Sequence, residues 1–203
     1  MARLLLIRHA PTSETGKKLT GRLAGVSLGE TGREAARATA GRLADLPLAA
    51  VYASPLERTW ETAEIVAEPH GLSPILEEGV IEVDYGRWSG RTLASLSKIK
   101  AWRTVQVTPS RMTFPDGENL ADAQRRAVAT CERLADRHRK QTIAVVSHSD
   151  IIKAILSHYL GQPFDLFQRI VISPTSVSVV DVPQDGVPMV LAMNANGGTG
   201  SWR

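Results

Sequence analysis

Short continuous apolar runs alternate along the chain with longer segments in which apolar residues recur every three or four positions. Continuous runs of this length are typical of buried strands, and the chain has four: 4–7, 48–53, 75–76 and 142–146. The helical spacing is found in five segments: 31–43, 55–67, 93–105, 120–139 and 150–160. Thr31 and Ser54 stand where a helix cap is expected, and Pro55 suits a first helical turn.

The C-terminal part has a different pattern. Ser176–Val179 alternates between polar and apolar residues, and Met189–Met193 is expected to pair back on it across a turn at 183–186. The glycine-rich tail 196–203 is predicted to be flexible. Strands that alternate with helices and end in a hairpin favour an α/β fold. We expect three layers, with helices on both faces of a mostly parallel central sheet that includes one or more antiparallel strands.

Composition adds little beyond an ordinary globular domain. A length of 203 residues predicts one domain, 1–203, in which 90–115 is a small cap insertion. A net charge of +3 is too small to indicate nucleic-acid binding. Cys131 is the only cysteine, so no intrachain disulfide forms, and no apolar run is long enough for a membrane span. These features predict a cytoplasmic protein with no membrane or nucleic-acid partner.

Polar residues with catalytic potential follow the predicted buried strands. Ligands of parallel sheets bind beyond the carboxyl ends of the strands, so residues at these positions are expected to meet. The first strand is followed by Arg8 and His9, and the strand at 48–53 by Ser54, with Arg58 one helical turn later. The strand at 142–146 is followed by Ser147, His148 and Ser149. Two histidines and two arginines should therefore converge at one edge of the sheet.

Two guanidinium groups that face one pocket repel each other unless an anion lies between them. A phosphoryl dianion satisfies both through two-point hydrogen bonds, and the backbone amides near Ser149 add donors at a helix start. A neutral His9 can attack phosphorus and form a phosphohistidine, because the surrounding positive charge lowers the pKa of its imidazole. His148 is expected to donate to the phosphoryl oxygens as charge develops.

Expulsion of an alkoxide also requires a proton donor. The acidic candidates are Glu77, Glu78, Glu82 and Asp84. Glu82 lies between Ile81 and Val83, and burial among apolar neighbours would raise the pKa of its carboxyl toward neutrality. We therefore expect Glu82 to be the acid.

Six short motifs, in order, resemble the histidine phosphatase superfamily, which has the phosphoglycerate-mutase-like fold. The resemblance covers about residues 3–182. Within the superfamily, the chain most resembles short bacterial members labelled probable phosphomutases or acid phosphatases. The motifs are Arg8-His9-Ala10, Leu19-Thr20-Gly21-Arg22, Ser54-Pro55-Leu56-Glu57-Arg58-Thr59, Glu82-Val83-Asp84-Tyr85-Gly86-Arg87-Trp88, Pro115-Asp116-Gly117-Glu118 and Val146-Ser147-His148-Ser149.

The resemblance implies that His9 accepts the phosphoryl group, which Arg8, Arg58 and His148 hold. It further implies that Glu82 protonates the leaving oxygen and then activates water, with no metal and no cofactor. Substrate contacts are expected from Arg8, Arg58, His148, Thr15, Gly21 and Ser149. Three positions depart from the family pattern: Ala10 and Ser149 replace glycines, and Thr15 replaces an asparagine.

The resemblance leaves the reaction open between a phosphatase and a phosphomutase. A mutase needs a long enclosing insertion with extra cations, whereas 90–115 has only 26 residues, so a phosphatase acting on a small phosphorylated metabolite is favoured. Arg103 and Arg111 in this segment are expected to be solvated, with a substrate carboxylate as their alternative partner. The substrate and the oligomeric state stay open, with a homodimer as one alternative.

Two further alternatives are less favoured. A metal phosphoesterase could use His9, Asp84, His148 and Asp150, but the chain has no closely spaced histidine pair to hold a metal. A protein that binds a phosphorylated partner without turnover would be expected to lack His9 or Glu82, and both are present.

Overall fold

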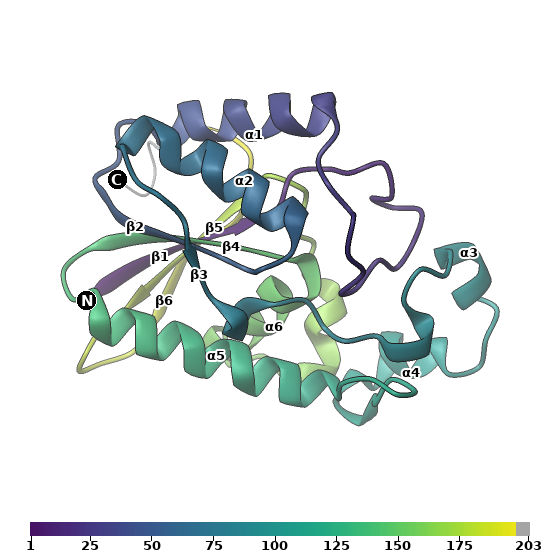
Figure 1. The fold of residues 1–203 in the computed structure, drawn as a ribbon. Coiled ribbons are helices and arrows are strands. Elements are labelled where there is room, and N and C mark those ends of the chain that lie inside the picture. The colour runs from purple at the N-terminus through teal and green to yellow at the C-terminus, as the bar shows by residue number, and fades with distance from the viewer. Residues whose placement is uncertain (198–203) are drawn as a thin grey trace.

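Six strands form one sheet in the order β3-β2-β4-β1-β5-β6 (Figure 1). The computed structural model describes residues 1–197. The strands are β1 (Ala2–Arg8), β2 (Leu48–Ala53), β3 (Ile75–Leu76), β4 (Thr142–Ser147), β5 (Val177–Val182) and β6 (Met189–Ala195). The neighbouring pairs β3–β2, β2–β4 and β4–β1 are parallel. β5 is antiparallel to β1, and β6 is antiparallel to β5. The predicted mostly parallel sheet with antiparallel strands is confirmed.

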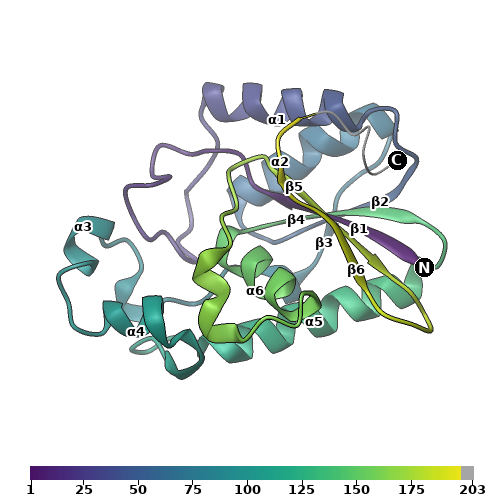
Figure 2. The same ribbon diagram turned by 180° about the vertical axis from the view of Figure 1, so that it is seen from behind.

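Helices cover both faces of the sheet (Figures 1 and 2). α1 (Glu30–Leu43) and α2 (Glu57–Ala67) pack on one face, and α5 (Leu120–Arg137) and α6 (Ser149–Tyr159) on the other. Successive residues of β1 point to opposite faces, which makes the strand apolar throughout. Leu4 and Leu6 join the core under α5 and α6, while Leu5 and Ile7 join the core under α1 and α2.

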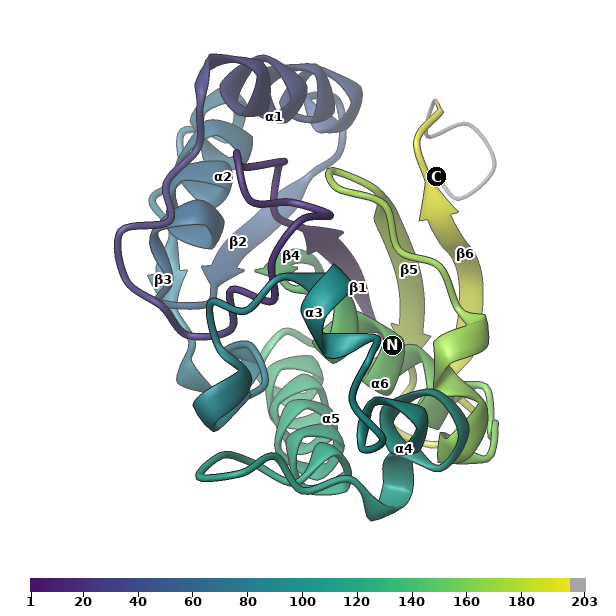
Figure 3. The same cartoon turned by 90° about the vertical axis from the view of Figure 1, so that its right-hand side faces the viewer.

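The segment 90–115 does not form the single helix expected over 93–105. It contains two short helices, α3 (Leu93–Leu96) and α4 (Trp102–Val107). Figure 3 looks toward the carboxyl ends of β1 and β4, and both short helices lie in its foreground. The segment therefore stands beyond the sheet edge at which ligands are expected.

The predicted helix starts were wrong at two places. α1 begins at Glu30 and its N-cap is Gly29, so Thr31 lies inside the helix. α2 begins at Glu57, and its N-cap residue Leu56 offers no side-chain acceptor. Ser54 does not cap α2, because its hydroxyl is bonded to His148 instead.

Adjacent strands β1 and β4 end level with each other. Arg8 pairs with Ser147 in register, and the amide of His9 donates to the carbonyl of Ser147 at 2.9 Å. The segments after the two strands consequently leave the sheet side by side. Along the part of the chain that is described, no helix combines the length and the apolar character needed to cross a bilayer. Residues 198–203 of the predicted flexible tail lie outside the described part.

Candidate active site

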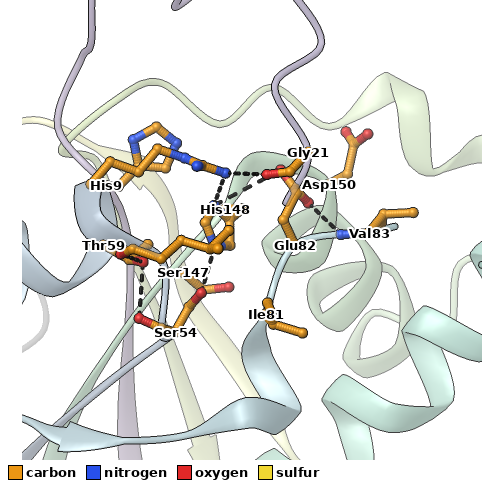
Figure 4. A network of polar contacts seen from close by, with 12 residues as sticks. His9, Gly21, Ser54, Thr59, Ile81, Glu82, Val83, Ser147, His148 and Asp150 are labelled. Carbon is orange, nitrogen blue, oxygen red and sulfur yellow. Dashed lines mark hydrogen bonds and ion pairs between the residues drawn. The ribbon is translucent and has the colours of Figure 1, made fainter. Parts of the chain in front are cut away.

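A hollow of about 190 Å³ lies at the carboxyl ends of β1 and β4. Six of the residues predicted from the sequence line it: Arg8, His9, Thr15, Gly21, Glu82 and Ser149. The other two, Arg58 and His148, are buried: Arg58 bonds to the carbonyl of Gly21 in the lining, and His148 lies beside His9 (Figure 4). The structure thus brings together all eight residues.

The two histidine rings lie close together although 138 residues separate them in the sequence. Their centroids are 5.3 Å apart and their planes are inclined by 57°. The β1–β4 pairing causes this proximity, because His9 follows one strand and His148 follows the other. Both side chains are buried.

His9 is held with one ring nitrogen free. Its Nδ1 lies 2.7 Å from the carbonyl oxygen of Ala10, which can only accept, so Nδ1 carries the ring proton. Burial, together with Arg58 and Arg8, lowers the pKa of His9 to about 3. The ring is therefore neutral at pH 7, and the lone pair is on Nε2.

His148 has protein partners at both ring nitrogens. The Nη2 of Arg58 donates to Nδ1 at 3.2 Å, so Nδ1 is unprotonated and Nε2–H donates to Ser54 Oγ at 2.7 Å. Burial and the nearby Arg58 and His9 hold its pKa well below the ordinary value. In this state His148 orients Arg58, and it can donate through Nδ1 to a phosphoryl oxygen only when Nδ1 carries a proton. Its predicted role as that donor stays a prediction.

Backbone carbonyls hold the two arginines. Nη1 of Arg8 donates to the carbonyl of Ile172 at 2.6 Å, and Nη2 of Arg58 donates to the carbonyl of Gly21 at 2.8 Å. Three buried donors, Nε of Arg8 together with Nε and Nη1 of Arg58, have no acceptor among residues 1–197. Buried donors are nearly always bonded, so three beside one hollow indicate an anion site.

Glu82 is 8% exposed. Its Oε1 accepts from the amide of Val83 at 3.0 Å, and its Oε2 lies 4.0 Å from Nδ1 of His148. Burial and the nearby charge of Asp150 raise its pKa to about 7, against the opposing effect of Arg58. A carboxyl with this pKa carries a proton in a large fraction of molecules at neutral pH and can donate it.

An ion-pair network fixes the backbone around Glu82. Nε of Arg22 donates to the carbonyl of Glu82 at 2.8 Å, and its Nη2 donates to Glu118 at 3.0 Å. Arg126 from α5 also binds Glu118 and donates to the carbonyl of Ile81 at 3.1 Å. This network gives a physical reason for the motifs at 19–22 and 115–118. Arg22 and Glu118 position the backbone of Glu82, although neither residue lines the hollow.

Thr15 and Ser149, which were predicted to contact the substrate, line the hollow, whereas the cations of 90–115 do not. The hydroxyl of Thr15 accepts from the amide of Thr12 at 2.9 Å, so it serves the loop that lines the hollow. Ser149 is the first residue of α6. The cations of 90–115 are all exposed and none lines the hollow: Arg91, Lys98, Lys100, Arg103 and Arg111.

Sequence reasoning missed three contributors. Ser54 was expected to cap a helix, and its bond to His148 shows only in three dimensions. Tyr85 and Asp150, of which Asp150 was considered only as a metal ligand, line the hollow and are bonded to each other, although 64 residues separate them. Across residues 1–197, no group of three or more His, Cys, Asp or Glu side chains is arranged to hold a metal ion.

Similar proteins are found among curated sequences and solved structures. The chain is 32% identical to phosphoserine phosphatase 1 of Hydrogenobacter thermophilus, over 91% of this chain and 88% of that protein. It is 31% identical to the "Probable phosphoglycerate mutase GpmB" of Erwinia tasmaniensis, over 91% and 86% of the two chains. The structure of YhfR from Bacillus stearothermophilus superposes with a TM-score of 0.90 at 27% identity, covering 97% of this chain and 98% of that one.

The family model "Histidine phosphatase superfamily (branch 1)" matches residues 4–196. This match spans every residue of the site, from Arg8 to Ile172, whose carbonyl accepts from Arg8. The chain therefore belongs to branch 1 of the histidine phosphatase superfamily and is an enzyme of that family.

Proposed function

We propose that this enzyme hydrolyses phosphate monoesters of small metabolites through a phosphohistidine on His9. One observation carries the proposal: a neutral imidazole with a free Nε2 stands beside buried guanidinium donors of Arg8 and Arg58 that have no acceptor among the described residues. A nucleophile next to an anion site of this kind suits transfer of a phosphoryl group.

In the first step, Nε2 of His9 attacks phosphorus while the bond from phosphorus to the ester oxygen breaks. Glu82 gives its proton to that oxygen, so the leaving group departs as a neutral alcohol. In the second step, water attacks the phosphohistidine and Glu82 takes a proton from the water. The phosphorus–nitrogen bond breaks, phosphate leaves, and both His9 and Glu82 return to their starting states.

Arg8 and Arg58 hold the phosphoryl oxygens throughout both steps. Their guanidinium groups are fixed by the carbonyls of Ile172 and Gly21, so little reorganisation is needed as charge develops. The scheme uses no metal and no cofactor, because the arginines supply the positive charge and Glu82 supplies the proton.

The size and charge of the hollow support a small substrate and hydrolysis. A volume of about 190 Å³ accommodates a phosphoryl group with a small alcohol. A mutase must also hold a second anionic group of its phosphorylated intermediate. Lys18 lines the hollow but is paired with Glu14 at 2.8 Å, and no cation of 90–115 lines it, which supports a phosphatase over the phosphomutase that one relative's name suggests.

Rapid-quench trapping tests the proposal. Wild-type enzyme mixed with labelled phosphate ester should form an acid-labile, base-stable phosphoenzyme, and His9→Ala should form none. His158→Ala is the matched control, because His158 is exposed on α6 and does not line the hollow. A phosphoenzyme that persists in His9→Ala would refute the assignment of the nucleophile.

Two further assays separate the alternatives. Release of phosphate from p-nitrophenyl phosphate should survive EDTA, and loss of release would favour a metal enzyme. Conversion of 3-phosphoglycerate in the presence of 2,3-bisphosphoglycerate, faster than its hydrolysis, would identify a mutase. Binding of phosphate without any turnover would identify a protein that only recognises phosphorylated ligands.

A further inference from the structure

A second carboxylate in the hollow has no role in the scheme above. Asp150 lines the same hollow as Arg8, His9 and Glu82, and its side chain is 17% exposed. Figure 4 shows it on the first turn of α6, on the same side as Glu82. A negative charge at this place opposes the binding of a phosphate dianion, so its presence calls for a compensating function.

Two donors hold Asp150 in its ionised form. The hydroxyl of Tyr85 donates to Oδ2 at 2.9 Å, and Nζ of Lys153 donates to Oδ1 at 3.1 Å. Lys153 is itself fixed, since it also donates to Gln168 at 3.0 Å. Burial disfavours the charge of Asp150, but Lys153 and the Tyr85 hydroxyl outweigh burial and hold its pKa below the ordinary value.

Glu82 has the opposite surroundings. Its side chain accepts one hydrogen bond, from the backbone amide of Val83, and no described lysine or arginine bonds to its carboxyl oxygens. Burial and the charge of Asp150 raise its pKa to about 7. The surroundings of Glu82 and Asp150 therefore drive these two carboxyl groups toward opposite protonation states. Such a pair is typical of an acid and its fixed counter-charge.

Cations that face Glu82 explain why the counter-charge is needed. Arg8 at the end of β1 and Arg58 on α2 both favour the ionised form of Glu82. Without an opposing anion, burial alone would counter them, so the pKa of Glu82 would be lower and fewer molecules would carry the proton that the leaving group needs. The titratable and charged groups that line the hollow with Glu82 or face it are Arg8, His9, Glu14, Lys18, Arg22, Arg58, Tyr85, His148 and Asp150, of which Glu14 and Lys18 pair with each other.

We propose that Asp150 is a positioning residue whose permanent negative charge keeps the proton of the hollow on Glu82. The proposal rests on the proposed function, in which Glu82 must be protonated to expel the alcohol. In this role Asp150 takes part in no bond that forms or breaks, and it acts through Glu82.

The pH dependence of kcat/KM tests this role. In wild-type enzyme acting on glycerol 3-phosphate, kcat/KM should fall above about pH 7 as Glu82 loses its proton. In Asp150→Asn that decline should begin about one pH unit lower, so that kcat/KM falls about 80-fold between pH 5.5 and pH 8, against about tenfold in the wild type. Asp150→Glu, which retains the charge, is the matched control and should keep the wild-type decline.

A purely structural role predicts a different result. Asp150→Asn would then lower kcat/KM by the same factor at every pH, with the decline unmoved, and this outcome would overturn the proposal. p-Nitrophenyl phosphate is the second control, because its leaving group needs little protonation. With this substrate, the fall of kcat/KM with rising pH should not shift to lower pH in Asp150→Asn.

A titration of the wild-type enzyme covers the case in which Asp150→Asn fails to fold. Carbon-13 NMR of labelled side-chain carboxyls should show Glu82 titrating near pH 7 and Asp150 remaining ionised from pH 5 to 9. Titration of Asp150 near neutrality would refute the proposal. Absence of a phosphoenzyme together with the expected titration would count against the proposed function alone.

Discussion

Glu82→Gln should stabilise the fold at alkaline pH while it impairs the reaction. Folding raises the pKa of Glu82 from its ordinary 4.5 to about 7. Between these values the folded state binds more protons than the unfolded state, so the free energy of unfolding falls as pH rises. At about 1.4 kcal/mol per pH unit, the full cost above pH 7 is about 3 kcal/mol. Glutamine has no charge to bury and avoids this cost.

Urea unfolding at pH 5 and pH 8 measures the difference. The gain in free energy of unfolding of Glu82→Gln over wild type should be larger at pH 8 than at pH 5 by about 2.5 kcal/mol. His9 and His148 also titrate on unfolding, but both proteins contain them, so their contribution largely cancels. Glu34→Gln, on the exposed face of α1, is the matched control, because it removes a carboxylate that is not buried. An equal gain for Glu82→Gln at both pH values would refute the assigned burial of its charge.

Three further changes test other parts of the site. Glu82→Gln should lower kcat/KM for an alkyl phosphate by about 10²- to 10⁴-fold but far less for p-nitrophenyl phosphate, and equal losses would exclude Glu82 as the acid. Ser54→Ala removes the acceptor of the His148 Nε2–H and should lower the free energy of unfolding by about 1–3 kcal/mol in urea titrations. Gly21→Ala places a Cβ 2.9 Å from Cδ2 of Tyr85 at a φ of +56°, so this variant should have a lower Tm and a lower kcat/KM than the wild type. Unchanged values would contradict the geometry.

The strands were predictable from the sequence because each central strand is buried on both faces and is therefore apolar throughout. Arg8, His9 and His148 follow such strands directly, so their convergence could be expected from the topology of parallel sheets. The same reasoning misplaced the start of α2. Local preference makes Ser54 a cap, but His148, 94 residues away in sequence, takes its hydroxyl.

The Asp150 arrangement was beyond reach of the sequence for a related reason. Its charge state depends on Tyr85 from a loop and on Lys153 one turn further along α6. Neither residue follows a strand, and no motif joins the three. Partners of this kind are set by packing between distant segments, which periodicity and turn signals do not report.

The central position of β1 beside β4 has a consequence for biosynthesis. β1 leaves the ribosome about 140 residues before its neighbour β4, which at about 5–20 residues per second is a delay of roughly seven to thirty seconds. During that interval the nascent polypeptide contains His9 and Arg58 but no second histidine to orient Arg58. Premature termination anywhere before β4 would accordingly release a fragment unable to assemble the phosphate pocket.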